Sequence, residues 1–571
     1  MMMQFPLPSE PRERAVGWEA RLAVLVVAAL LAFRLPALAQ SAGSSPAQVA
    51  RPASTATYRI SGKVVDAHTG APLARCSVQI ADVKDRGQPQ TVTSDDNGGF
   101  VFNGLTRGKY SLTAERRGYM SQSYEEHDQF STAIAVAPGL DSENLIFNLT
   151  AEAIIAGTVT DEAGEPVRGA QVRLFEDQDA DGIRTTQQRQ MVMSDDRGVY
   201  EISGLHPGAY FLVVTAHPWY AQRLPHMQTG GEQSGESSEM QALDLGYPTT
   251  FYPGATDQDA ATPIPVKGGD RLQADVTLTP QPALRLRLNL PQKTGEVNRM
   301  PSVSLTQSIF GQTEGLPTQI MGRPDGTMEL DGILPGHYDV TLGGFGPDGQ
   351  PTAGPKHYQA DLTNGATELP EDSGVGEITV TGKVTSSAAK LPPNAGISLR
   401  APNARHQEYG ALNDAGEFSI GITPGTYEVL GNINGMHIAS LKASGALLAG
   451  RMLTVKAGDI PKLEIVAGSG HGEIEGTVLR NGKPVSAVMV LLAPEDPKNN
   501  PILFRRVQSD SDGTFDLSNI FPGRYRLLAI ESGWELEWAN PAVLQVFLAK
   551  SVPIEVNSGD HLKQSIEVQD R

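Results

Sequence analysis

Short stretches in which apolar and polar residues alternate recur along the whole chain, each bounded by turn-forming residues. Phe515 and Leu517 alternate with polar positions, and Tyr338, Val340 and Leu342 do the same in an earlier stretch. A period of two turns one face of a strand toward a core and the other toward water. No periodicity typical of helices stands out beside it. The pattern predicts an all-β protein.

One composite stretch occurs five times along the chain. It reads SDDNGGFVFNGLTRGKY at 94–110, SDDRGVYEISGLHPGAY at 194–210, RPDGTMELDGILPGHY at 323–338, NDAGEFSIGITPGTY at 413–427 and SDSDGTFDLSNIFPGRY at 509–525. Asp or Asn close before Gly favours a tight turn, and Pro-Gly reverses the chain before a second strand. Each copy therefore predicts a β-hairpin. Because a catalytic carboxylate pair would not recur five times with varying neighbours, we expect these acidic residues to serve the turns.

Further strands flank each hairpin and complete a unit of about seven strands, the size of a small β-sandwich. Upstream lie YRISGKVVDAHTGAPLARCSVQI and its counterparts, and downstream lies a closing strand such as VKAGDIPKLEIV. The upstream element is weak in the fourth copy and mostly lost in the third. The repeats predict a tandem array of about five β-sandwiches, at residues 53–152, 153–281, 282–375, 376–468 and 469–571.

The N-terminal residues have the order of an export signal. Arg12, Arg14 and Arg21 flank the apolar run 22–33, and the small-residue triplet Ala37-Leu38-Ala39 follows. This order predicts a signal peptide at 1–39, cleaved after Ala39, and then a flexible linker at 40–52. The run is shorter than the roughly 20 residues that cross a bilayer, so membrane attachment is expected only if the signal stays uncleaved as an anchor.

Charge and cysteine content exclude several classes of function. The 571 residues carry a formal net charge of −19, and such a surface repels the phosphates of nucleic acid. Cys76 is the only cysteine, which excludes disulfides within the chain and zinc sites built from cysteine. Its place in the apparent strand ARCSVQI predicts a small buried apolar residue. An exported chain without disulfides favours a bacterial envelope.

The order of these elements resembles the carboxypeptidase regulatory-like domain family, whose fold is a transthyretin-like (prealbumin-like, Ig-like) β-sandwich. The matching residues in the first copy are Ile60, Gly62, Val64, Pro72 and Val78, and in the second Ile155, Gly157, Val159, Pro166, Ala170 and Val172. The resemblance is strong in copies one, two and five, moderate in the fourth and weak in the third. It implies non-catalytic modules. No H-x-x-E or H-E-x-x-H zinc motif accompanies them, so we expect no enzyme.

The best candidate for a metal site is EDQDADG in the second unit. Asp177, Asp179 and Asp181 with Gly182 follow the pattern D-x-D-x-D-G, which places oxygen ligands around one loop, as Ca²⁺ prefers. Gln188 stands where a helix-loop-helix calcium site needs Glu, and no flanking helices are expected. A calcium-binding β-loop that stiffens the domain is one interpretation, and a solvated acidic loop is the other.

The best candidate for a ligand site is aromatic. The segment after the second tyrosine strand contains a Gly-, Ser- and Glu-rich stretch flanked by Trp219, Tyr220, Tyr247, Phe251 and Tyr252. Exposed rings at the end of a sandwich stack on sugars or fill pockets of a partner. The alternative is that these rings cover their own core, or the joint with a neighbouring domain.

Taken together, the residues predict a non-catalytic exported protein of the cell envelope that binds a glycan or an envelope protein through its sandwiches. Periplasm, outer surface and extracellular space all remain open as its location. A first alternative is a calcium-stiffened adhesin or stalk without a small ligand. A second alternative is an accessory or regulatory subunit of a peptidase or outer-membrane transporter.

Overall fold

The computed structural model describes residues 57–85, 87–221, 244–289, 302–316, 319–322, 327–345, 351–363, 368–369, 374–386, 390–402 and 407–571. The predicted signal peptide at 1–39 and linker at 40–52 lie outside them. Residues 56–571 form one compact unit. Within the described residues, no helix is long and apolar enough to cross a membrane.

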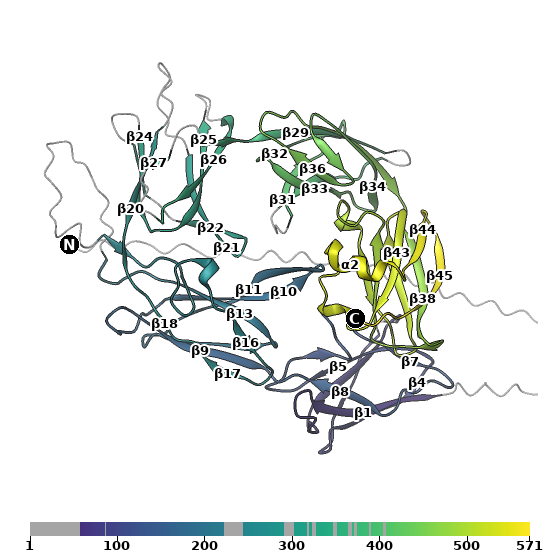
Figure 1. Ribbon diagram of the computed structural model, residues 1–571. Coiled ribbons are helices and arrows are strands. Elements are labelled where there is room, and N and C mark those ends of the chain that lie inside the picture. The colour runs from purple at the N-terminus through teal and green to yellow at the C-terminus, as the bar shows by residue number, and fades with distance from the viewer. Residues whose placement is uncertain are drawn as a thin grey trace, which may run out of the picture. The chain divides into compact units, whose positions relative to one another are not determined.

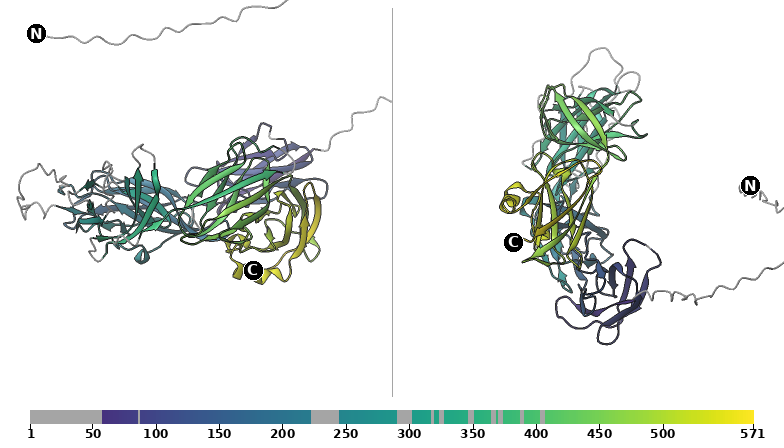
Figure 2. Two further views of the ribbon diagram at one scale, coloured as in Figure 1. Left: turned by 90° about the horizontal axis from the view of Figure 1, so that it is seen from above. Right: turned by 90° about the vertical axis from the view of Figure 1, so that its right-hand side faces the viewer.

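The described chain is built almost entirely from strands, which form five pairs of sheets and one small two-stranded sheet, and this confirms the all-β prediction (Figure 1; Figure 2 gives two further directions). Each pair encloses its own apolar core. We refer to the pairs as the first to fifth sandwich. The exact boundaries of the predicted domains stay predictions, because the five sandwiches belong to the same compact unit.

One sheet of each sandwich has the same three-part plan. The opening strand pairs antiparallel with the strand after the Asp/Asn-Gly turn and parallel with the closing strand. The opening strands are β1 (Tyr58–Asp66), β9 (Ala153–Thr160), β20 (Leu284–Asn289), β29 (Ile378–Ser386) and β38 (Gly472–Arg480). The post-turn strands are β4 (Gly99–Leu105), β12 (Val199–Leu205), β24 (Thr327–Ile333), β32 (Glu417–Ile422) and β42 (Thr514–Ile520). The closing strands are β8 (Leu145–Leu149), β17 (Arg271–Gln273) with β18 (Val276–Thr277), β27 (Glu368–Leu369), β37 (Lys462–Ser469) and β45 (His561–Glu567).

The second sheet has a central strand between two antiparallel neighbours. The central strands are β2 (Ser77–Asp82), β10 (Gln171–Ala180), β21 (Ser302–Ile309), β30 (Gly396–Arg400) and β40 (Met489–Pro494). On one side lie β3 (Gln90–Thr93), β11 (Ile183–Met193), β22 (Gln312–Leu316), β31 (Gln407–Ala411) and β41 (Arg505–Gln508). On the other side lie the tyrosine strands, β5 (Gly108–Glu115), β13 (Gly208–Thr215), β25 (His337–Phe345), β33 (Gly425–Asn432) and β43 (Gly523–Ile530).

The remaining strands extend these sheets or pair with each other. They are β6 (Gln122–Ser123), β7 (Ile134–Val136), β14 (Leu245–Gly246), β15 (Thr250–Phe251), β16 (Ile264–Val266), β19 (Gln281–Pro282), β23 (Gln319–Gly322), β26 (Pro351–Asp361), β28 (Val375–Gly376), β34 (Met436–Ser444), β35 (Leu447–Ala449), β36 (Met452–Val455), β39 (Lys483–Pro484) and β44 (Val552–Val556). In the part of the chain that the structure describes, three short 3-10 turns occur at Gln258–Ala260, Pro501–Leu503 and Gly533–Glu535.

The tyrosine of every repeat makes the same hydrogen bond. Its hydroxyl donates to the carbonyl oxygen of the residue four positions earlier, at the turn that precedes the strand. The bonds join Tyr110 to Thr106, Tyr210 to His206, Tyr338 to Leu334, Tyr427 to Thr423 and Tyr525 to Phe521, at 2.6 to 3.0 Å. The buried ring thus anchors the turn to the core, which explains a tyrosine at this position in all five copies.

Among the described residues, one α-helix departs from the prediction that the units are all strands and turns. Helix α2 (Pro541–Leu548) lies in the fifth sandwich. Asn540 caps it by accepting a hydrogen bond from the Ala542 N–H, and Pro541 occupies the first turn, where its missing N–H costs nothing. Leu544 and Phe547, three residues apart, form its buried face. The segment is too short for its periodicity to stand out in the sequence.

Candidate functional site

The five predicted aromatic ligand residues do not form one exposed face. Trp219 is 84% exposed, and its ring meets Tyr220 edge-on with centroids 5.7 Å apart. Tyr247 is 3% exposed, and Tyr252 is half-buried against the core of the second sandwich. Phe251 is buried in a separate apolar cluster. Residues 222–243, most of the segment between these rings, lie outside the described residues.

Tyr220 and Tyr247 both lie beside the carboxylate of Glu162. Tyr220 donates a hydrogen bond of 2.6 Å to Glu162, and the Tyr247 hydroxyl lies 3.5 Å from the other carboxylate oxygen. Burial raises the pKa of Tyr247, and the nearby Tyr220 and Glu162 add to the rise. Both tyrosines are therefore held as neutral donors, and Trp219 presents the exposed ring beside them.

Phe251 belongs to the joint between the second and third sandwiches. It packs with Phe175 and Val213 of the second sandwich and with Ile309 of the third. The Phe310 ring contacts Phe251 edge-on at 5.7 Å, and the Phe310 backbone N–H donates to the Gln258 side chain. For Phe251, the alternative stated above, that the ring covers a joint, is the one the structure supports.

The acidic motif is part of a β-hairpin rather than an open loop, which corrects the local conformation expected for it. Asp177 and Asp179 lie on β10, and Asp181 and Gly182 form the tip that leads into β11. Asp177 accepts a hydrogen bond of 2.8 Å from Arg184 across the hairpin. Among the described residues, no group of three His, Cys, Asp or Glu side chains is arranged to hold a metal. Calcium binding at these carboxylates stays a prediction.

The hairpin tip instead docks on the fifth sandwich. The Gly182 carbonyl accepts a hydrogen bond of 3.1 Å from the Ala539 N–H. Gly182 has a φ of +76°, and a Cβ there would lie 2.4 Å from the Trp538 ring. Burial raises the pKa of Asp179, and the negative Glu537 contributes to the rise. The glycine of the motif therefore permits a close approach between sandwiches.

Trp534 and Trp538 form the centre of a joint between the fifth and first sandwiches. Trp534 stacks on His127 and on Phe130 of the first sandwich, with centroids 5.4 and 5.3 Å apart. The Arg506 guanidinium lies 5.1 to 5.7 Å from the ring centroids of Phe130, Trp534 and Trp538 and pairs with Asp128 at 2.7 Å. Stacking and cation–π contacts of this kind stabilise a dry interface.

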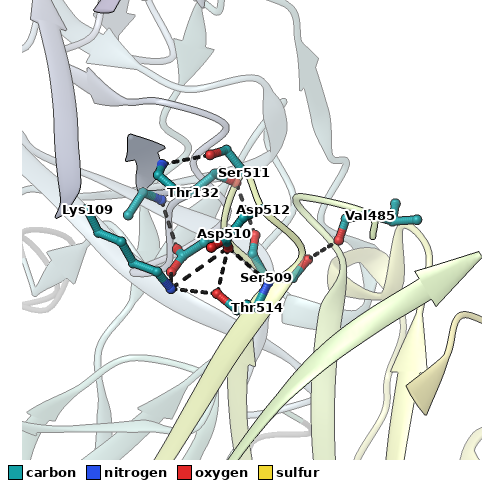
Figure 3. A network of polar contacts seen from close by, with 10 residues as sticks. Lys109, Thr132, Val485, Ser509, Asp510, Ser511, Asp512 and Thr514 are labelled. Carbon is teal, nitrogen blue, oxygen red and sulfur yellow. Dashed lines mark hydrogen bonds and ion pairs between the residues drawn. The ribbon is translucent and has the colours of Figure 1, made fainter. Parts of the chain in front are cut away.

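A polar network continues this joint (Figure 3). The Lys109 ammonium of the first sandwich bonds the Asp510 carboxylate and donates to Thr514 Oγ1 at 2.6 Å. The other Asp510 oxygen accepts from the Ala133 N–H at 3.0 Å. Ser511 adds two bonds, one from its N–H to the Ala133 carbonyl and one to its hydroxyl from the Ala135 N–H. The network therefore joins the turn 509–514 to the edge of β7.

Asp510 has a different role from its counterparts in other repeats. Asp95, Asp195 and Asn413 each accept two backbone N–H bonds from their own turn. In the fifth copy Asp512 accepts the turn bond from the Thr514 N–H, and the Asp510 carboxylate is free to cross the joint. Burial raises the pKa of Asp510 although Lys109 opposes the rise, whereas backbone N–H donors lower the pKa of Asp195.

Sequence reasoning missed this joint. The residue before the repeat tyrosine is lysine only in the first copy, and the others have Ala209, His337, Thr426 and Arg524 there, so no pattern marks Lys109. The spacing Asp510-Ser511-Asp512 supplies a second carboxylate to the turn. It is the one signal in the sequence that Asp510 is not needed to accept the hydrogen bonds of its own turn.

Comparison with solved structures finds proteins with little sequence identity to this chain. The Bacillus anthracis TIE protein is 11% identical, with 91% of this chain and 76% of that chain covered and a TM-score of 0.17. The minor pilin GBS52 of Streptococcus agalactiae is 13% identical, with 42% and 100% covered and a TM-score of 0.21. BcpA, the major pilin subunit of Bacillus cereus, is 13% identical, with 73% and 99% covered and a TM-score of 0.14. These likenesses carry no argument about function.

The family comparison agrees with the repeat pattern. A search of curated proteins finds no match to the sequence. The model of the carboxypeptidase regulatory-like domain matches residues 59–150 and 154–237, which include all but the first residue of the opening strands β1 and β9 and the whole of the tyrosine strands β5 and β13. The first two sandwiches of this chain are therefore carboxypeptidase regulatory-like domains.

Proposed function

We propose that this chain is an exported, non-catalytic protein of the cell envelope that binds carbohydrate or another envelope protein through its sandwiches. The observation that carries the proposal is the use of the repeated acidic residues. Asp95, Asp195 and Asn413 accept hydrogen bonds within their own turns, and Asp510 joins two sandwiches. These side chains serve architecture, as expected of a family of non-catalytic modules.

The joints support a binding role because they fix several modules in advance. The contacts of Trp534 with His127 and of Phe310 with Phe251 are aromatic, and both occur between sandwiches. A surface assembled before binding loses less conformational entropy when a ligand arrives. Trp219 offers an exposed ring on this scaffold, next to the hydroxyl of Tyr220.

Co-sedimentation with insoluble polysaccharides and with isolated cell envelopes tests the proposal. We expect the full chain to sediment with one of them, and Trp219→Ala to reduce the bound fraction. Tyr409→Ala is the matched control, because Tyr409 is also exposed, at 49%, but lies on the fourth sandwich. Release of reducing sugar or free amine during incubation contradicts the non-catalytic part, and sedimentation with neither material contradicts the binding part.

Export is tested separately with alkaline phosphatase, which is active only in an oxidising compartment, fused to the C-terminus of the full chain. We expect phosphatase activity in intact cells, and its absence contradicts export.

The stalk stiffened by calcium is the second candidate, favoured by the acidic surroundings of Asp179. Burial raises the pKa of Asp179 most, Arg184 opposes the rise, and the negative charges of Glu537, Asp177 and Asp128 add to it. Millimolar calcium would then raise the melting temperature, a chelator would reverse the rise, and Asp179→Ala would abolish it. Equal melting temperatures with calcium and with chelator rule this candidate out.

A further inference from the structure

A cavity of about 980 Å³ lies where residues of all five sandwiches meet. Its walls include Phe130 of the first sandwich, Arg184 of the second, Phe310 of the third, Arg400 of the fourth and Arg505 of the fifth. Ligand sites in proteins commonly have volumes of about 300 to 1,000 Å³. The cavity is therefore large enough for a short oligomer, and a ligand there would touch every sandwich.

The charged side chains of the wall have a positive excess, in a chain whose net charge is −19. Four arginines line the cavity with two acids, Asp181 and Glu428. Three of the arginines are paired with acids: Arg184 with Asp177, Arg400 with Glu428 and Arg506 with Asp128. These pairs leave Arg505 as the arginine of the described wall that has no carboxylate partner.

Arg505 is the exception among these arginines. Its guanidinium donates to the carbonyl oxygens of Ile502 and Phe504 at 2.9 and 2.7 Å and lies over the Phe521 ring. Among the described residues it forms no ion pair with a carboxylate. Burial lowers its pKa, which reflects the cost of holding this charge away from water. Nε also donates to the Asn519 carbonyl at 3.4 Å, so Nη2 is the guanidinium nitrogen left to bind a ligand. An anionic group in the cavity would offset the cost of burial, and Nη2 can donate a charged hydrogen bond to a carboxylate.

The remaining wall is suited to a ligand rich in hydroxyl groups. Glutamine amides, which both donate and accept hydrogen bonds, come from Gln129, Gln258, Gln312 and Gln407, and hydroxyls come from Thr185 and Thr186. The half-buried Phe130 and Phe310 add apolar surface to this wall. Amides, hydroxyls, apolar surface and an unpaired arginine together match a sugar that carries a carboxylate.

We propose that this cavity binds a short acidic oligosaccharide of the uronic acid type, with its carboxylate at Arg505. The inference rests on the carbohydrate part of the proposed function and names the class of sugar. A ligand held by all five sandwiches would stabilise their packing, because it binds the assembled form and not the separated one.

Calorimetric titration of the full chain with trigalacturonic acid tests the proposal, with neutral maltotriose as the comparison. We expect trigalacturonic acid to bind and to lose affinity as salt rises, and maltotriose to bind at least about tenfold more weakly, since a charged hydrogen bond contributes about 1.5–3 kcal/mol. Arg505→Gln should weaken trigalacturonic acid binding by about tenfold or more. Arg524→Gln is the matched control, because Arg524 is on the same sandwich with a side chain 74% exposed, outside the cavity.

A second variant guards against misfolding of the first. Thr186→Phe keeps every charge and places an aromatic ring in the cavity, so it should weaken binding while the melting temperature without ligand stays near that of the parent. Equal binding of the two sugars, unchanged binding by Arg505→Gln, or no binding of trigalacturonic acid each overturns the proposal. Co-sedimentation with polysaccharide that persists beside any of these results leaves the proposed function standing, so the two can fail separately.

Discussion

The same residue type at the same repeat position does two different things in this chain. Asp195 and Asp510 open equivalent turns, but Asp195 accepts the N–H groups of Arg197 and Val199, whereas Asp510 faces Lys109 and Ala133. Backbone donors favour the charged carboxylate, and burial disfavours it. Equivalent positions in the sequence therefore have opposite electrostatic environments.

This difference predicts opposite titrations. Asp195 should titrate below its ordinary pKa of 3.8 and Asp510 above it. The contribution of Asp195 to stability is then present above the unfolded pKa and lost as pH falls through the folded pKa. The contribution from the raised pKa of Asp510 is full below the unfolded pKa and lost as pH rises through the folded one. Carboxyl carbon NMR, assigned with Asp195→Asn and Asp510→Asn, measures both, and shifts of the same sign contradict the prediction.

Gly182 should tolerate no side chain. In Gly182→Ala the new methyl group meets the Trp538 ring, and the residue keeps a φ of +76°. We expect the free energy of unfolding to fall by about 2–4 kcal/mol because of backbone strain and overpacking together. Gly164→Ala isolates the backbone part, because Gly164 has a φ of +81° with nothing within 4 Å of its Cβ position. Its expected loss is about 1 kcal/mol. Denaturant unfolding compares the two variants. Equal losses in the free energy of unfolding mean that the contact with Trp538 does not affect stability.

At the scale of elements, the turns and strands were predictable because their causes are local. Alternation, Asp/Asn-Gly turns and a closing strand after Gly predict the two sheets of each unit, and the buried Cys76 was also correctly expected. Helix α2 could not be predicted, because its burial depends on packing against β40 and β43 rather than on its own eight residues. The hairpin β10–β11 was predicted as a loop because its acidic residues match a loop motif, and that match was given more weight than the strand alternation around it.

The tyrosine bond of the repeats gives a prediction for one element. Tyr525→Phe removes the hydroxyl that donates to the Phe521 carbonyl at 2.7 Å and leaves that acceptor without this partner. We expect the free energy of unfolding to fall by about 1–3 kcal/mol. Tyr409→Phe is the control, because Tyr409 is half exposed and its bond to the Asn394 carbonyl is 3.4 Å long. Thermal unfolding that shows no difference between the two variants contradicts an anchoring role for the hydroxyl.

At the scale of the whole molecule, the contacts between sandwiches lie beyond what one sequence can predict. Lys109 and Asp510 are 401 positions apart, and neither is marked by a pattern. The aromatic candidates divide for the same reason: Phe251 is drawn into a joint by Phe310, and Trp219 stays exposed because nothing in the described residues covers it. Local sequence specifies each sandwich, whereas complementarity between distant surfaces specifies their packing.

Hydrogen exchange measures that packing directly. The N–H groups of Ala133 and Ala135 bond to Asp510 and Ser511, so their exchange is slow only while the first and fifth sandwiches stay together. Asp510→Ala should speed exchange at both amides by about tenfold, as the loss of a charged hydrogen bond predicts. Asp195→Ala, the equivalent change in the second sandwich, should leave these amides unaffected. Unchanged exchange in Asp510→Ala shows that the network does not hold the joint.

The joint between the first and fifth sandwiches can form only late in the synthesis of the chain. Ala133 is made 377 positions before the aspartate that its N–H will meet. At a synthesis rate of about 5–20 residues per second, the edge of β7 waits roughly 20 to 75 seconds for its partner. During that interval Phe130 lacks the partner ring of Trp534, and a chain that stops short never acquires it. The surface of the first sandwich therefore differs between a complete and an incomplete chain, and a chaperone or protease could distinguish the two.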